Sequence, residues 1–132
     1  MTQDIENKTI RRLDVLNGEL CDPKWSDIEA AIRQLDGLTH TIVILGIGDP
    51  IPHMAIGGGK RDHYVLYATF DNVVFYTLAD PTMGPGQMQL VVGSQGGNYE
   101  RRNCVTLDLA LKAAKTYAET GQLDSQLTWD SK

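Results

Sequence analysis

Residues 64–78 decide the fold class; they read Tyr-Val-Leu-Tyr-Ala-Thr-Phe, then Asp-Asn, then Val-Val-Phe-Tyr-Thr-Leu. Two runs rich in aromatic and β-branched residues, 64–70 and 73–78, are separated only by Asp71-Asn72. Aromatic and β-branched side chains favour strands, and Asp and Asn tolerate the positive φ that a tight turn requires. The stretch therefore predicts a β-hairpin with two antiparallel strands.

Further strand-like runs flank this hairpin. Three of them share its apolar and β-branched composition: residues 41–45, 53–56 and 87–92. Glycines and prolines make 46–52 and 81–86 loops, and Gly93–Asn98 reads as a turn region. The opening segment 9–16 fits either a strand or a helix.

A first helix is predicted before the strands. Ser26-Asp27-Ile28-Glu29 has the pattern of a capping box, in which the Ser hydroxyl and the Glu carboxylate each accept from a backbone N–H of the first turn. Apolar residues then recur at helical spacing: Ile28, Ala31, Ile32 and Leu35. We expect Gly37 to end this helix in the left-handed conformation.

A second helix is predicted near the C-terminus. Thr106 is its expected N-cap, Asp108 lies where the helix dipole favours a negative charge, and Gly121 is its expected end. Its apolar stripe comprises Leu107, Ala110, Leu111, Ala114, Tyr117 and Ala118.

The order of these elements predicts the architecture. A helix, several strands joined by hairpins and a second helix indicate an α+β fold. We expect a single domain over residues 1–132, with an antiparallel sheet of about five strands and an N-terminal and a C-terminal helix packed on one face. A chain of 132 residues with 42% hydrophobic residues is long enough to bury such a core.

Charge and composition narrow the classes of partner. Lys and Arg total 12 and Asp and Glu total 17, which gives a formal net charge of −5. Phosphate backbones and anionic lipids repel such a chain, so we expect a basic partner and no direct contact with nucleic acid or a membrane. Residues 1–7 lack the pattern of a signal peptide, and Cys21 and Cys104 lack a CxxC spacing, so we expect a cytoplasmic protein with reduced thiols.

No motif predicts catalysis, a metal or a cofactor. His40, His53 and His63 lie on separate predicted elements, and the zinc deaminase signatures are missing from the sequence. Asp71, Asp80 and Glu100 could converge in space, although carboxylates in turns are usually solvated. We therefore expect no catalytic, metal or cofactor-binding residue and no enzyme.

The segment Gly57–Arg61 leaves an alternative open. Three glycines followed by Lys60 and Arg61 could hold an anion through backbone N–H groups and two cations, but the spacing does not match a Walker P-loop. The alternative function is therefore a small anion- or nucleotide-binding α+β domain. A third hypothesis is a scaffold that dimerises through an exposed strand edge.

The C-terminal part of the chain carries a family resemblance. Residues 113–121 read Ala-Ala-Lys-Thr-Tyr-Ala-Glu-Thr-Gly, and Leu127-Thr128-Trp129 follows after a short spacer. A helix with alanines and an aromatic residue, a Thr-Gly stop and a Trp near the terminus resemble the ending of the first family of bacterial polymorphic-toxin immunity proteins. Gly57–Gly59 and the hairpin also look like the central section of that family, so the resemblance covers about residues 40–130.

The resemblance implies a function and transfers no catalytic residue. A member would bind a cognate interbacterial toxin, of which nucleic-acid deaminases are the typical kind, and inhibit it by covering its active site. We expect the interface on the loop side of the fold, because Tyr and Met are common at interfaces and carboxylates can pair with Lys or Arg of a toxin. The candidate residues are Asp80, Met83, Gln87, Met88, Tyr99 and Glu100.

Overall fold

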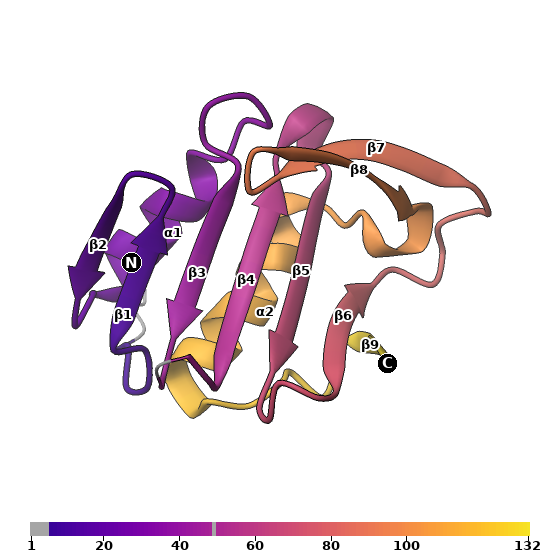
Figure 1. Cartoon of the computed structure of the whole chain (residues 1–132). Helices are drawn as coiled ribbons and strands as arrows, with labels where there is room; N and C mark the ends of the chain where they lie inside the picture. The colour runs from indigo at the N-terminus through magenta and orange to yellow at the C-terminus, as the bar shows by residue number, and fades with distance from the viewer. Residues whose placement is uncertain (1–5, 49) are drawn as a thin grey trace, which may run out of the picture.

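A computed structural model describes residues 6–48 and 50–132 as one large sheet with two helices and a separate strand pair (Figure 1). The polar sequence at residues 1–5, on which the signal-peptide prediction partly depends, lies outside this range. Within the described residues, seven strands form the large sheet in the order β2-β1-β3-β4-β5-β6-β9, and all its pairings are antiparallel. These strands are β1 (Arg12–Val15), β2 (Gly18–Cys21), β3 (Ile42–Gly46), β4 (His53–Gly58), β5 (Tyr64–Thr69), β6 (Phe75–Ala79) and β9 (Thr128–Ser131).

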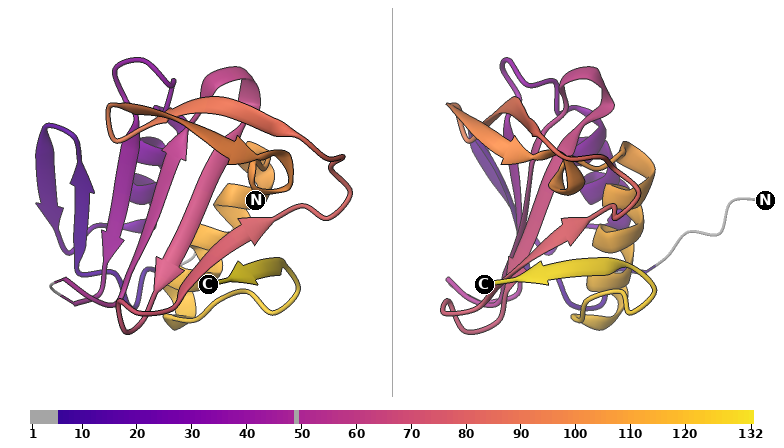
Figure 2. Two further views of the ribbon diagram at one scale, coloured as in Figure 1. Left: turned by 45° about the vertical axis from the view of Figure 1, so that its right-hand side comes forward. Right: turned by 90° about the vertical axis from the view of Figure 1, so that its right-hand side faces the viewer.

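The remaining elements lie on either side of this sheet. They are the helices α1 (Trp25–Arg33) and α2 (Leu107–Thr120), the short 3₁₀ turns η1 (Lys60–Asp62) and η2 (Arg101–Asn103), and the strands β7 (Gln87–Val92) and β8 (Gln95–Glu100). Both helices lie behind the sheet in the view of Figure 1, and the β7–β8 pair, which we call the arm, crosses in front of it (Figures 1 and 2). The predicted α+β class is confirmed, whereas the expected number of about five strands was too low.

The extra strands come from segments with weak local signals. The ambiguous segment 9–16 contains β1, which pairs with both β2 and β3. The predicted turn region Gly93–Asn98 was wrong in extent: only Gly93 and Ser94 form the turn, with φ of 59° and 67°, and the following residues belong to β8. Two consecutive residues with positive φ are typical of a tight hairpin turn.

Only the second helix has the predicted limits. The Thr106 hydroxyl accepts from the N–H of Leu109, and Gly121 ends α2 with φ of 72°. The predicted capping box of α1 was wrong, because the helix starts after Lys24 and the Asp27 carboxylate accepts from the Lys24 N–H at 2.9 Å. The helix also ends at Arg33, before Gly37. In the described range no helix has the length and apolar character needed to span a membrane.

The sheet register separates a core face from an open face. Leu13, Leu45, Met54 and Ala68 lie side by side on neighbouring strands and are buried in the main core, together with the apolar sides of both helices. Their neighbours along each strand point the other way, because successive side chains of a strand alternate between the two faces. These residues, which include Tyr67, form the face that the arm crosses.

The arm is anchored to the sheet near its tip. The N–H of Gly93 donates to the carbonyl oxygen of Thr41 at 3.1 Å, and the N–H of Ser94 donates to the Thr41 hydroxyl at 2.9 Å. Val92 lies so close to Gly57 that a Cβ there would be 2.4 Å from its Cγ1 atom. Gly57 therefore permits the arm to rest on β4.

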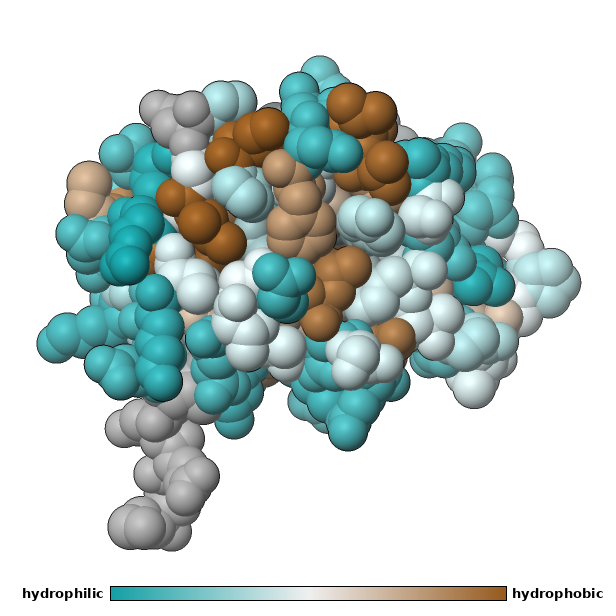
Figure 3. Space-filling view, turned by 90° about the horizontal axis from the view of Figure 1, so that it is seen from below, coloured by the Kyte–Doolittle hydropathy of each residue, from teal (hydrophilic) through white to brown (hydrophobic). Residues whose placement is uncertain are grey.

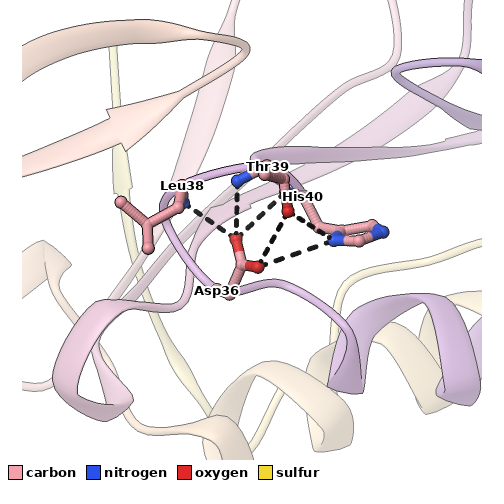
Figure 4. A network of polar contacts seen from close by, with 4 residues as sticks. All are labelled: Asp36, Leu38, Thr39 and His40. Atoms are coloured by element: carbon pink, nitrogen blue, oxygen red, sulfur yellow. Dashed lines mark hydrogen bonds and ion pairs between the residues drawn. The ribbon is translucent and has the colours of Figure 1, made fainter.

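The Asp36 carboxylate fixes the loop that precedes Thr41 (Figure 4). Its Oδ1 atom accepts hydrogen bonds from the N–H groups of Leu38, Thr39 and His40 at 2.8–3.0 Å. These bonds, the one from Leu38 foremost, hold the pKa of the Asp36 carboxyl well below its usual range. The loop conformation that positions Thr41 is therefore tied to an ionised Asp36.

We predict that Gly57→Ala destabilises the protein. The added methyl group would overlap Val92, a short and stiff side chain, so the arm has to move. Overpacking of this kind costs about 1–3 kcal/mol in the free energy of unfolding, measured by urea denaturation. Gly96→Ala is the control: no atom lies within 4 Å of its Cβ position, so its effect should stay within about 0.5 kcal/mol. Equal free energies of unfolding of the two variants would contradict the close contact between Val92 and Gly57.

We predict that Asp36→Ala lowers stability near neutral pH and that its difference from the natural protein shrinks in acid. The folded-state pKa of Asp36 is depressed, so its contribution is complete above the ordinary value of 3.8 and is lost as the pH falls below it. Urea midpoints at pH 6, 4 and 3 measure this difference. Glu119→Ala, on the exposed side of α2, serves as control. A difference that stays constant with pH contradicts the role given to the carboxylate.

Candidate interaction surface

A row of aromatic rings lies on the open face of the sheet. Tyr67, from β5, lies between His53, from β4, and Phe75, from β6, with ring centroids 6.0 Å and 5.8 Å from its own. The direct cross-strand neighbours of Tyr67 are the small residues Ala55 and Thr77. We call His53, Tyr67 and Phe75 the aromatic row; all three side chains are partly exposed.

The arm borders the aromatic row. Burial raises the pKa of Tyr67, and the nearby Tyr99 hydroxyl of β8 acts in the same direction. The Tyr67 hydroxyl therefore keeps its proton at neutral pH and can donate a hydrogen bond. Tyr99 lies across Gly97, with its Oη atom 3.3 Å from the position that a Cβ of that glycine would occupy.

Two arginine–carboxylate pairs flank the row. Arg12 Nε is 2.7 Å from Asp14 Oδ2, on β1. At the other edge Arg102 donates two hydrogen bonds to Asp130, at 2.8 Å and 2.9 Å, and these bonds lower the pKa of that carboxyl. The sequence between residues 62 and 100, which supplies β5 to β8, contains no Lys or Arg. The open face thus offers aromatic and acidic groups with few competing cations.

The predicted interface residues lie in this region but not on a single surface. Met88 and Tyr99 are opposite each other in the arm and pack inward, against a small cluster of Val65, Leu90 and Cys104. Gln87 and Glu100 are also opposite each other, with Gln87 Nε2 3.3 Å from Glu100 Oε1, and are exposed. The strand alternation places these two pairs on opposite faces of the arm.

Asp80 and Met83 lie in the loop that leads to the arm. The Asp80 carboxylate accepts from the hydroxyl of Thr82 at 2.6 Å and from its N–H at 3.0 Å, which lowers the pKa of Asp80. The N–H of Met83 donates to the Asp80 carbonyl oxygen. This loop is therefore ordered by its own hydrogen bonds at the base of the arm.

The structure does not bring the candidate acid residues together. Asp71 accepts from the N–H groups of Val73 and Val74 in the β5–β6 turn, whereas Asp80 follows the other end of β6. Over residues 6–48 and 50–132, no group of three or more His, Cys, Asp or Glu side chains could hold a metal ion. Both cysteines are free; Cys21 is exposed and Cys104 is buried.

The glycines of the Gly57–Arg61 segment have structural roles. Gly57 and Gly58 belong to β4, and the N–H of Gly59 already donates to the carbonyl oxygen of His63 at 2.8 Å. The expected cradle of glycine N–H groups is therefore not formed as predicted. Lys60 and Arg61 remain exposed beside the arm.

The aromatic row was not predicted, although the alternation of side chains in the predicted hairpin indicates it. Leu66 and Ala68 face the core, so strict alternation puts Tyr67 on the other face, and the cross-strand register then brings Phe75 near it. The expected interface was chosen by residue type and loop position alone.

Apolar side chains continue at the lower end of the sheet. Figure 3 shows them gathered over the loops at this end, surrounded by polar residues. Val73, two residues before Phe75, is 75% exposed. The apolar character of the open face thus extends to the β5–β6 turn.

Comparison with known families places these features in context. Residues 19–131 match the family described as Immunity protein Imm1. A comparison with curated proteins gives no match. The match extends from β2 to β9. It therefore begins about twenty residues earlier than the resemblance seen in the sequence, which covered about residues 40–130. The chain therefore belongs to the Imm1 family of immunity proteins.

Proposed function

We propose that this protein neutralises a cognate interbacterial toxin, a nucleic-acid deaminase, by covering the active site of the toxin in a stoichiometric complex. The contact surface is the aromatic row together with the arm and the loop before it. The observation that carries this proposal is the aromatic row, which lies open on the sheet between the arm and two flanking arginine–carboxylate pairs.

The chemistry of this surface suits a cationic partner. A protein that acts on nucleic acid needs Lys and Arg side chains to hold phosphates. Such side chains stack on the faces of Tyr and Phe, and they can pair with carboxylates at the rim of an interface. Tyr67 and Phe75 supply the rings, and Asp80 and Glu100 supply carboxylates near the arm.

The distribution of charge supports electrostatic steering toward that partner. Residues 62–100 contain the four carboxylates of Asp62, Asp71, Asp80 and Glu100 and no Lys or Arg, so this stretch holds four of the five net negative charges. The acidity of this stretch comes from its lack of cations more than from a dense acidic cluster. Such a field mainly raises the association rate.

Inhibition by covering the active site of the toxin requires no catalysis by the immunity protein itself. The immunity protein would act in the cytoplasm of the toxin-producing cell or its siblings, where an incoming toxin meets its substrate. Inhibition would follow a one-to-one titration of the toxin, without turnover and without a cofactor. Co-expression with the toxin encoded by the neighbouring reading frame, scored as rescue of growth, tests the pairing.

We predict that Tyr67→Ala and Phe75→Ala each weaken binding to the cognate toxin domain by about thirty-fold or more, as expected for aromatic residues at an interface centre. Calorimetric titration of the toxin measures the affinity. Lys112→Ala, on α2 behind the sheet, should bind like the natural protein. Circular dichroism confirms that each variant is folded. Natural affinity in both aromatic variants would exclude the open face as the contact surface.

We predict that the double charge reversal Asp80→Lys with Glu100→Lys slows association, and that the effect grows as the ionic strength is lowered. Stopped-flow association rates at several salt concentrations measure it. Asp108→Lys with Glu119→Lys changes the net charge equally but on α2, so it should slow association less. If both double variants slow association equally, the rate depends only on the net charge of the protein. Asp80 and Glu100 are then not part of the contact surface.

A further inference from the structure

A second surface, between η1 and the arm, has the features of a ligand site. Two adjoining hollows of about 320 Å³ each lie between η1 and the arm. They share Lys60, Gln89 and Leu90 as lining residues. The volume of each hollow lies in the range that small ligands occupy in proteins.

The hollow stays open because Gly96, which faces it, has no side chain. Gly96 and Gly97 of β8 line one hollow, and no atom lies within 4 Å of the position that a Cβ of Gly96 would take. Gln89 and Asn98 are opposite each other across the arm and both line the same hollow. Their amides can donate and accept hydrogen bonds, next to the apolar side chain of Val91, which lies opposite Gly96.

The other end of the hollow is cationic. Arg61 joins Lys60 in the lining, and within the described residues neither side chain forms an ion pair or a hydrogen bond. Arg61 has a φ of 55° and Asp62 one of 59°, a conformation that is rare for these residues. The Asp62 carboxylate accepts from the N–H of Leu107 at the start of α2, and the turn presents its two cations beside the arm.

We propose that this hollow binds a phosphate-bearing ligand of mononucleotide size. Lys60 and Arg61 hold the phosphate, the ring of the base lies against Val91, and the amides of Gln89 and Asn98 contact the polar edge of the base. The net charge of the chain disfavours a long polyanion, so the ligand is a free nucleotide and not a nucleic-acid strand.

This site shares the arm with the proposed toxin contact but does not include the aromatic row. Gln89, Asn98 and Gly96 lie on the outer face of the arm, whereas Tyr99 and Met88, which also lines the second hollow, lie on its inner face. Nucleotide binding is measured without the toxin, so the inference does not depend on the toxin proposal. Loss of nucleotide binding and loss of toxin neutralisation are measured separately and distinguish the failure of one from the failure of the other.

Calorimetric titration of the full chain with adenosine and guanosine 5′-monophosphates tests the proposal, with adenosine, inorganic phosphate and an octathymidine strand as comparisons. We expect at least one monophosphate to bind more tightly than adenosine and more tightly than phosphate. No binding of either monophosphate overturns the proposal. An octathymidine strand that binds more tightly than both monophosphates overturns the assignment to a free nucleotide.

Three variants locate the site. Lys60→Ala with Arg61→Asn should weaken nucleotide binding by at least about ten-fold, because hydrogen bonds to charged groups are lost. Asn tolerates the left-handed conformation at position 61. Lys112→Ala with Lys115→Ala removes the same charge from α2 and should leave binding unchanged. Gly96→Val should block the monophosphate by filling the hollow. Equal binding by all three variants places the ligand elsewhere and overturns the proposal.

Discussion

The close approach of Val92 to Gly57 is the steric constraint on which the arrangement of the surface depends. Only a residue without a Cβ lets the arm rest on β4 at this distance. Thr41 then accepts both N–H groups of the hairpin turn, and the Asp36 carboxylate holds the loop in front of Thr41. A local loop conformation thereby fixes where the arm crosses the sheet.

Because the arm crosses only one face of the sheet, the two faces differ in what covers them. The helices seal one face with apolar side chains, and that face supplies the stability of the domain. The arm covers only part of the other face (Figures 1 and 2), and Tyr67 and Phe75 on that face are partly exposed. Under the proposed function this partly exposed aromatic row contacts the toxin, a role that the stability of the domain alone does not require.

The sequence predicted those elements whose signals are local. The hairpin at 64–78 and the ends of α2 depend on turn residues and caps. Both strands of the hairpin form, although residues 70–74 connect them and not Asp71-Asn72 alone, and the ends of α2 have the expected form. The strands β2 and β8 were missed because Gly-Glu-Leu-Cys and the glycine-rich Gln95–Glu100 lack apolar alternation and form strands through pairing. The interface residues stay a prediction; among them Met88 packs inward, which only the register of the arm determines.

We propose that the open face and the arm form the contact with the toxin. Hydrogen–deuterium exchange of the immunity protein, free and bound to the cognate toxin domain, tests it most directly. We expect added protection of backbone amides in the arm, in the loop before it and in β5 and β6, with no change in α2. Protection confined to α1 and α2, with the arm unchanged, would contradict it.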